Sequence, residues 1–320
     1  MKPLVSICIP NYNGEKFLEE SLKSAISQTY PNIEIIVLDN ASTDKSCDIV
    51  KSFGNKVKLY RHRTNVGYND NLNSCIRIAE GKYIKILHSD DMLEINAVEI
   101  QVIAMEKSDN IGISYGSVNF IDESGKPVEK TSFSVDVEGI TSGMKKLEEL
   151  LKGNHIMFPS VMIRKKCFDN IGLFDGEIPY CNDWDMWMRI CMHYDIAFIH
   201  EAIARYRIHT ESGTKKYEET HIDGFDQYKC LTKIFTMISD EILLNRKSGF
   251  FRRLAGEQIS RGLYFVSNGN KAHGRRCILT SAIISNNPAF TVIVYVIYMS
   301  TFFGKRFSGI LLQLGRLMTK

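Results

Sequence analysis

The chain has 320 residues, of which 44% are hydrophobic and 24% are charged, and its formal net charge at pH 7 is +3. This composition places it among globular proteins with ample material for a core. The eight cysteines form no CxxC pair, so we interpret them as small buried side chains in a reducing compartment rather than as a disulfide framework or a zinc site. The N-terminal residues show no apolar segment followed by a cleavage site, so a secretory signal is not expected and the cytoplasm is the expected location.

Apolar runs alternate with helical patterns in the first part of the chain. Four short apolar runs are expected to be strands: residues 4–9, 33–38, 57–60 and 82–87. The helical patterns lie between them, at residues 17–26, 42–53 and 68–79. Alternation of this kind predicts right-handed crossovers and an α/β fold with a mostly parallel, Rossmann-like sheet.

Polar clusters stand where these expected strands end. They are Pro10–Asn13, Asp39–Asp44, Arg61–Gly67 and His88–Asp91. Ligands of open parallel sheets bind beyond the carboxyl ends of the strands, so these four loops are expected to converge on one crevice. The second half of the chain is more mixed. Its pattern predicts strands near 111–120 and 196–208, a turn at 122–127, and helices near 142–152 and 183–194.

The C-terminal part is both basic and apolar. After Glu257 the chain has eight Lys/Arg and no Asp/Glu, and residues 277–304 carry no charge. The most apolar stretch, residues 289–303, is shorter than the roughly 20 residues that a spanning helix needs. We therefore expect an in-plane pair of amphipathic helices on an anionic membrane surface; the alternatives are a buried helical hairpin and a single membrane span. Because apolar residues interleave the basic ones, nucleic acid is not an expected partner.

Candidate metal ligands stand in the sequence His88-Ser89-Asp90-Asp91. Two adjacent carboxylates repel each other, and a divalent cation such as Mg²⁺ or Mn²⁺ would cancel that repulsion and hold a diphosphate. The alternative is that Asp90 or Asp91 caps a helix expected to begin near Glu94.

Asp39 and Tyr12 are candidates for binding a nucleotide base. Asp39 directly follows a buried run, where its carboxylate could accept the imide N–H of uracil or thymine, and Tyr12 could stack on the base. The alternatives are a turn-forming aspartate and an ordinary surface aromatic.

A candidate general base and further candidate ligands lie later in the chain. Asp183 stands at the start of a helical pattern, where it could deprotonate an acceptor hydroxyl or simply cap the helix. His209 could complete a metal shell, although a lone histidine is more often structural. Arg207 or Lys215 could neutralise a diphosphate.

Taken together and in order, these motifs resemble those of family 2 of the inverting glycosyltransferases, which have the GT-A fold. The matching stretches are VSICIPNYN (5–13), SQTYPNIEIIVLDNASTDKS (27–46), NVGYNDNLNSCIRIAEGKYIKILHSDD (65–91), NDWDMWMRI (182–190) and YRIH (206–209). The resemblance implies a catalytic domain over residues 1–212. The remainder is interpreted as a helical connector at 213–257 and a membrane-associating helical segment at 258–320.

The resemblance also implies roles for single residues. Those expected to bind the donor nucleotide are Pro10, Tyr12, Asn13, Asp39, Asn65 and Asp90. Asp91 is similar to the family's direct metal ligand, His209 to a histidine that helps hold metal or diphosphate, and Asp183 to the catalytic base. The sequence departs from the family pattern at two places: His88 stands at the first acidic position of the common DxDD form, and Asn182 precedes the base in place of an acid.

The resemblance and the candidate residues together imply a metal-dependent enzyme, using Mn²⁺ or Mg²⁺, that transfers a sugar from a UDP- or dTDP-sugar. The expected acceptor is a lipid-linked oligosaccharide at the inner face of the cell membrane, as in bacterial surface polysaccharide assembly. One alternative is a nucleotidyltransferase, although PNYNGEK (10–16), with its single glycine, differs from the usual phosphate loop. Another is a nucleotide-sugar-binding protein without catalysis.

Overall fold

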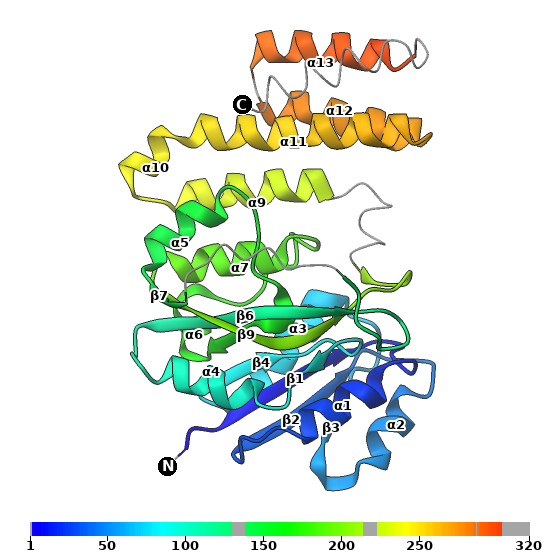
Figure 1. Cartoon of the computed structure of the whole chain (residues 1–320), viewed down its shortest axis with the longest axis vertical. Coiled ribbons are helices and arrows are strands. Elements are labelled where there is room, and N and C mark those ends of the chain that lie inside the picture. The colour runs from blue at the N-terminus through cyan, green and yellow to red at the C-terminus, as the bar shows by residue number, and fades with distance from the viewer. Residues whose placement is uncertain (1, 130–137, 214–222, 286, 303–320) are drawn as a thin grey trace. The chain divides into compact units, whose positions relative to one another are not determined.

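The computed structural model describes residues 2–129, 138–213, 223–285 and 287–302. It divides into two compact units, residues 1–210 and residues 211–320, and each is described by itself. In the first unit the described residues form a nine-stranded sheet (Figure 1). Its strands are β1 (Val5–Asn11), β2 (Ile33–Asp39), β3 (Lys58–Arg61), β4 (Tyr83–Ile86), β5 (Met92–Leu93), β6 (Ile111–Ile121), β7 (Gly139–Thr141), β8 (Met162–Arg164) and β9 (Asp195–Arg207).

The helices of the first unit connect these strands and cover the sheet. They are α1 (Leu18–Ile26), α2 (Ser46–Ser52), α3 (Tyr68–Ile78), α4 (Ala97–Met105), α5 (Gly143–Leu150), α6 (Lys166–Ile171) and α7 (Asn182–Cys191), with short 3₁₀ turns η1 (Gly54–Lys56) and η2 (Phe158–Ser160). All seven residues of β1 are buried, because this strand lies between β2 and β4 and its two faces are covered. From α1, Leu18, Leu22 and Ala25 pack into the same core, at the spacing of one helix face.

The strand order is β3-β2-β1-β4-β8-β6-β9-β5, and β7 pairs with β9. The pairs among β1, β2, β3 and β4 are parallel, so the crossovers expected in the first part of the chain are present. The prediction of a mostly parallel sheet is wrong for the second half. The short strand β8 inserts between β4 and β6 and runs antiparallel to both, so the sheet is mixed.

The described part of the second unit is helical. Its helices are α9 (Asp223–Met237), α10 (Glu241–Asn245), α11 (Lys247–Ser267), α12 (Lys271–Ser285) and α13 (Pro288–Ser300). α12 packs along α11 and contacts α13 (Figure 1). The break between α12 and α13 falls at Asn287, whose side chain accepts hydrogen bonds from two backbone N–H groups of the first turn of α13 and caps that helix.

Helix α13 has one packed face and one exposed face. Val294 and Ile297 are buried in a cluster with residues of α11 and α12. The large apolar residues that α13 exposes are Val292, Ile293, Tyr295, Val296 and Met299. Phe302, just beyond the helix, is exposed as well. Among the described residues, no helix combines the length and the apolar character needed to cross a membrane.

Candidate active site

The loop after β2 is organised around the carboxylate of Asp39. Its Oδ1 accepts a hydrogen bond from Nδ2 of Asn11 (3.0 Å), and its Oδ2 accepts from the backbone N–H of Ser42 (2.9 Å) and from Nε of Arg61 (3.1 Å). Burial acts to raise the pKa of Asp39, but the hydrogen bonds from Ser42 and Asn11 outweigh it and lower the pKa below its usual value. Asp39 therefore stabilises a turn, which is one of the two roles expected for it. Its Oδ1 accepts from Asn11, and a carboxylate oxygen can accept a second hydrogen bond.

Asparagine side chains join the loops after β1, β2 and β3. Nδ2 of Asn40 donates to Oδ1 of Asn65 (3.0 Å) and to the carbonyl of Gly67 (3.1 Å). Oδ1 of Asn13 accepts from the backbone N–H of Thr43 (2.9 Å). Asn13 has a φ of 50°, in the left-handed region that asparagine tolerates better than most residues. The three loops thus form one connected polar group.

Two further residues expected to bind the nucleotide belong to the same strand end. Pro10 is buried within β1, whereas Tyr12, directly after the strand, is 52% exposed. An aromatic ring that remains half-exposed next to a polar loop is suited to stacking on a planar ligand.

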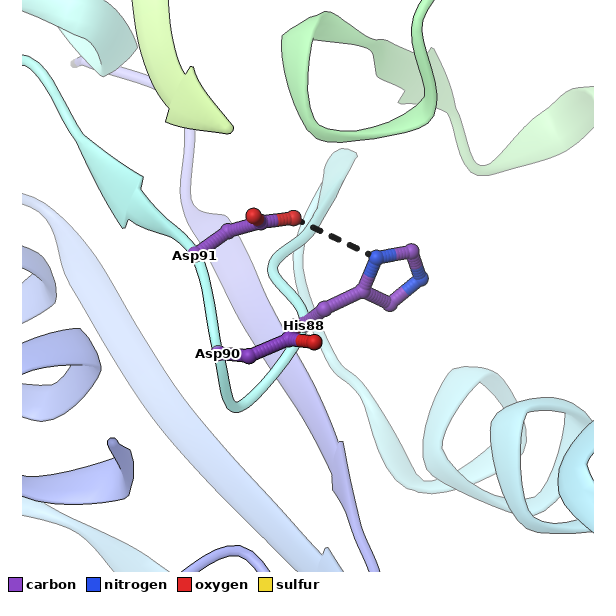
Figure 2. Close-up of side chains that lie close together, drawn as sticks. All are labelled: His88, Asp90 and Asp91. Atoms are coloured by element: carbon purple, nitrogen blue, oxygen red, sulfur yellow. Dashed lines mark ion pairs between the residues drawn. The ribbon is translucent and has the colours of Figure 1, made fainter. Parts of the chain in front are cut away.

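The chain after β4 makes a tight turn at residues 88–91. The backbone N–H of Asp91 donates to the carbonyl of His88 (3.2 Å), and Oγ of Ser21 donates to the same carbonyl (3.2 Å). The turn gathers the side chains of His88, Asp90 and Asp91, which Figure 2 shows, and one ligand atom of each lies within 4.8 Å of the others. Among the described residues, these three could hold a metal ion.

The two aspartates of this turn have different partners and different acidities. Oδ2 of Asp90 lies 2.9 Å from Nε2 of His209, and Oδ1 of Asp91 accepts from the backbone N–H of Arg207 (2.9 Å). Burial, and then the charge of Asp90, raise the pKa of Asp91 to about 6. Burial acts in the same direction on Asp90, but its hydrogen bond with His209 and the charge of His88 lower its pKa below the usual value. The pair thus has the electrostatic repulsion that a bound cation relieves.

Neither aspartate caps the helix that follows. The strand β5 intervenes, and α4 begins at Ala97 with Asn96 as its N-cap residue. The capping alternative for Asp90 and Asp91 is therefore excluded, and their carboxylates face one another and the histidines.

The donor set fits a divalent cation, since carboxylate oxygens suit Mg²⁺ and Mn²⁺ and an imidazole nitrogen suits transition metals. His209 belongs to this region but contacts the cluster through Asp90. Its ring packs edge-on against Phe17 at 5.0 Å between centroids, and its Nδ1 is buried without a hydrogen-bond partner among the described residues.

Asp183 lies in the first turn of α7, where Cys181 is the N-cap residue. Its Oδ2 accepts from Nδ2 of Asn154 (3.0 Å), and its Oδ1 accepts from the backbone N–H of Trp184 (2.7 Å). Burial raises the pKa of Asp183 to about 6, while the charge of His88 acts in the opposite direction, so the two side chains are within electrostatic reach. A carboxyl group with this acidity can accept a proton at neutral pH.

Arg207 lies in a different setting from the one expected for a diphosphate ligand. Its guanidinium is buried: Nε donates to the carbonyl of Asp90 (2.8 Å), Nη1 to the carbonyls of Asp122 and Glu123 (3.2 Å each), and Nη2 to a carboxylate oxygen of Glu20 (2.6 Å). All three guanidinium nitrogens are thus engaged by the protein. Arg207 ties α1 and the end of β6 to the turn at 88–91.

Two residues of this region, Tyr68 and Asn154, are not assigned from the sequence, and a third, Phe158, is expected from the sequence only to line the acceptor side. Oη of Tyr68 lies 2.7 Å from Nε2 of His88, the ring of Phe158 lies 4.8 Å from the His88 ring, and Asn154 holds Asp183. Tyr68 opens α3 within the matched stretch 65–91, which is the one signal that could have found it. Phe158 and Asn154 lie in a stretch without a recognisable motif.

The loop after β1 approaches the turn at 88–91 closely. A Cβ atom on Gly14 would lie 2.3 Å from Oδ1 of Asn11 and 3.0 Å from Oγ of Ser89, so the loop after β1 passes tightly against the turn at 88–91, where a larger residue would clash. Lys215, the other expected diphosphate ligand, lies outside the described residues.

Two solved structures illustrate the similarity of the fold. TarS of S. aureus in complex with UDP-GlcNAc matches with a TM-score of 0.68 and 18% identity, covering 100% of this chain and 88% of that one. A mannosyltransferase of Pyrobaculum calidifontis, PcManGT, in complex with GDP-Man and Mn²⁺, matches with a TM-score of 0.59 and 14% identity, covering 100% of this chain and 86% of that one. The fold is thus α/β and GT-A-like.

Sequence comparisons give the family. The family model described as glycosyl transferase family 2 matches residues 6–172. An uncharacterized glycosyltransferase of Rickettsia prowazekii (strain Madrid E) is 32% identical over 265 residues, which are 80% of this chain and 74% of that relative. The chain belongs to glycosyl transferase family 2.

Proposed function

We propose that this glycosyltransferase moves a sugar, with inversion at the anomeric carbon, from a UDP- or dTDP-sugar to an acceptor hydroxyl. The observation that carries the proposal is the placement of Asp183, whose pKa is raised to about 6, within electrostatic reach of the turn that holds Asp90 and Asp91. A proton acceptor beside a cluster that fits a metal ion is the arrangement needed to activate a hydroxyl next to a diphosphate.

The nucleotide side of the proposal rests on the connected loops after β1, β2 and β3. The exposed ring of Tyr12 would stack on the base, and Oδ1 of Asp39 would accept its imide N–H. The surroundings of the base and ribose would be formed by Pro10, Asn13, Asn65 and Asp90. That TarS was solved with UDP-GlcNAc supports a uridine nucleotide.

In the transfer step, Asp183 accepts the proton of the acceptor hydroxyl as its oxygen attacks the anomeric carbon. The new glycosidic C–O bond forms on the face opposite the leaving group, the bond between the anomeric carbon and the diphosphate oxygen breaks, and the configuration inverts. Asn154 holds Oδ2 of Asp183 and so fixes the orientation of the base. A divalent cation, when bound, stabilises charge on the leaving diphosphate. Asp90 and Asp91 would hold it, and His209 holds Asp90.

The expected result of a direct test is slow release of nucleoside diphosphate when the purified protein is incubated with the correct donor and Mn²⁺ but no acceptor. Chromatography of the nucleotides over a panel of UDP- and dTDP-sugars identifies the donor. Early NMR spectra of the released sugar give its anomeric configuration before it equilibrates. Retention of the donor's configuration would contradict inversion. A donor that raises the melting temperature but is never cleaved, even with acceptors, would contradict catalysis.

The acceptor is proposed to be a lipid-linked oligosaccharide at the inner face of the cell membrane, as in bacterial surface polysaccharide assembly. In this proposal residues 1–212 form the catalytic domain, 213–257 a connector, and 258–320 a segment that lies on the anionic membrane surface. Support comes from α13, which has no charged residue and exposes apolar side chains opposite its packed face. Contiguous exposed apolar surface of this kind marks a binding surface, and the excess of basic residues after Glu257 favours anionic lipid.

The double substitution Val292→Glu with Val296→Glu is expected to reduce sedimentation with phosphatidylglycerol vesicles at least about 10-fold, because it places two charges on the exposed face of α13. Ile242→Glu, at an exposed apolar position of α10, is the matched control and should leave binding unchanged. Equal sedimentation of the wild type with phosphatidylglycerol and phosphatidylcholine would contradict the anionic preference. No sedimentation with either would contradict membrane binding itself.

A further inference from the structure

The histidine that replaces the first acid of the DxDD pattern is turned toward the metal-binding carboxylates. Nδ1 of His88 lies 3.4 Å from Oδ2 of Asp91, as the dashed line in Figure 2 marks. The turn hydrogen bond between Asp91 N–H and the His88 carbonyl fixes the two residues at this spacing. The His88 side chain is 24% exposed and that of Asp91 is 2% exposed, so the pair lies at the edge of the protein interior.

The other nitrogen of the imidazole already has a partner. Nε2 of His88 lies 2.7 Å from Oη of Tyr68, and the ring packs at 4.8 Å from the ring of Phe158. In the tautomer whose Nε2–H donates to the tyrosine oxygen, the lone pair of Nδ1 faces a carboxylate oxygen of Asp91; in the other tautomer Nδ1–H points at that oxygen. Two acceptors that face each other need a proton or a metal ion between them. A hydrogen-bond partner on the distal nitrogen is also the usual way in which proteins orient a metal-binding histidine.

The expected ligand His209 lies further back. Its Nε2 contacts Oδ2 of Asp90 at 2.9 Å, so it orients a carboxylate of the cluster rather than adding its own nitrogen to it. The three side chains whose ligand atoms gather within 4.8 Å are His88, Asp90 and Asp91.

We propose that His88 is a metal ligand through Nδ1, which gives this site one nitrogen and two carboxylate ligands and a preference for Mn²⁺ over Mg²⁺. The inference rests on the proposed metal-dependent function and names the ion. Mg²⁺ takes oxygen ligands in near-ideal octahedral geometry, whereas an imidazole nitrogen favours transition-metal ions. Tyr68 is then a positioning residue for the ligand.

The test is metal binding without any sugar donor, measured on the full chain with inorganic pyrophosphate present. Electron paramagnetic resonance reports free Mn²⁺, and competition by Mg²⁺ reports the preference. His88→Ala is expected to weaken Mn²⁺ binding at least about 10-fold, and Tyr68→Phe to weaken it less. His88→Asp, which restores an all-oxygen set, is expected to shift the preference toward Mg²⁺ by about 10-fold or more. A gain in Mg²⁺ binding cannot come from misfolding. His193→Asp, at an exposed histidine, is the matched control.

Wild-type Mn²⁺ affinity in His88→Ala, an unchanged Mn²⁺/Mg²⁺ ratio in His88→Asp, or no metal binding by the wild type would each overturn the proposal. These outcomes can be distinguished from a failure of the proposed function. If the protein bound Mn²⁺ through His88 but cleaved no nucleotide sugar, the role of His88 as a metal ligand would be supported and the proposed sugar transfer would be contradicted.

Discussion

Replacing Asp183 by asparagine is expected to lower sugar transfer at least about 100-fold, because the amide cannot accept the proton of the acceptor hydroxyl. The wild-type rate is expected to rise as the pH increases through about 6, the pKa to which burial raises Asp183, and to level off above it. The residual rate of Asp183→Asn should lack this step. Initial rates of nucleotide release with donor and acceptor, measured from pH 5 to pH 8, check both expectations.

Stability measurements separate this effect from unfolding. The folded-state pKa of Asp183 lies above its unfolded value, so the folded state holds the proton more tightly and stability falls as the pH rises from about 4 to about 6. Asparagine removes this penalty but has a single side-chain oxygen, so it keeps only one of the hydrogen bonds that Asn154 and the backbone N–H of Trp184 donate to Asp183. Because the two changes oppose each other, Asp183→Asn should melt close to the wild type at pH 7.5. Asp185→Asn is the opposite control, because Asp185 is buried in an ion pair with Arg189 and its loss should lower the melting temperature. Near-normal sugar transfer by Asp183→Asn would contradict the assignment of Asp183 as the base.

The sequence predicts the parallel half of the sheet well, because its strands are visible as local apolar patterns. β1 and β2 are apolar runs because parallel strands inside an α/β sheet are buried on both faces, and their ends are set by Asn11 and Asp39. The antiparallel half could not be derived in this way. β8 has three residues and ends in a buried arginine, Arg164, and its place between β4 and β6 depends on pairing partners far along the chain.

The candidate site, like the fold, was predictable where a local motif carries the information and not where distant residues meet. Asp91 and Asp183 stand out because a carboxylate in a short motif is visible in the sequence. The environment of each is not visible: the contact of Asp91 with Arg207 joins residues 116 positions apart, and that of Asp183 with Asn154 joins residues 29 apart. Arg207 illustrates the limit. Its residue type favours a phosphate ligand, whereas burial and four carbonyl or carboxylate acceptors make it part of the framework.

The structure also shows the surroundings of His88, one of the two departures from the family motif. His88 replaces an acid at the start of the turn, and it is this histidine that contacts Asp91, pairs with Tyr68 and lies within electrostatic reach of Asp183. A cationic or metal-bound group at position 88 stabilises the ionised form of the neighbouring carboxylates, whereas an additional acid there would raise their pKa values further. A histidine in place of an aspartate at position 88 thus changes the charge of the site by up to two units.

Replacing Asp91 by asparagine is expected to abolish the stabilisation of the protein by Mn²⁺ and to lower sugar transfer at least about 100-fold. Asparagine has the size of aspartate, and its Oδ1 can still accept the hydrogen bond from the backbone N–H of Arg207, so the turn at 88–91 should persist. What is lost is the negative charge of a carboxylate whose residue is 2% exposed. Thermal melting with increasing Mn²⁺, together with initial rates, checks both effects.

The matched control is Asp122→Asn. Asp122 also accepts hydrogen bonds from backbone N–H groups in a turn, from Ser124 (2.8 Å) and Lys126 (3.0 Å), but this turn follows β6 and its carboxylate is not part of the cluster. That variant should retain the wild-type response to Mn²⁺. Asp90→Asn should fall between the two, because one carboxylate oxygen of Asp90 is already engaged by Nε2 of His209. If Asp91→Asn kept the full Mn²⁺ response while Asp90→Asn lost it, the metal would be held by Asp90, and Asp91 would be an acceptor that positions Arg207.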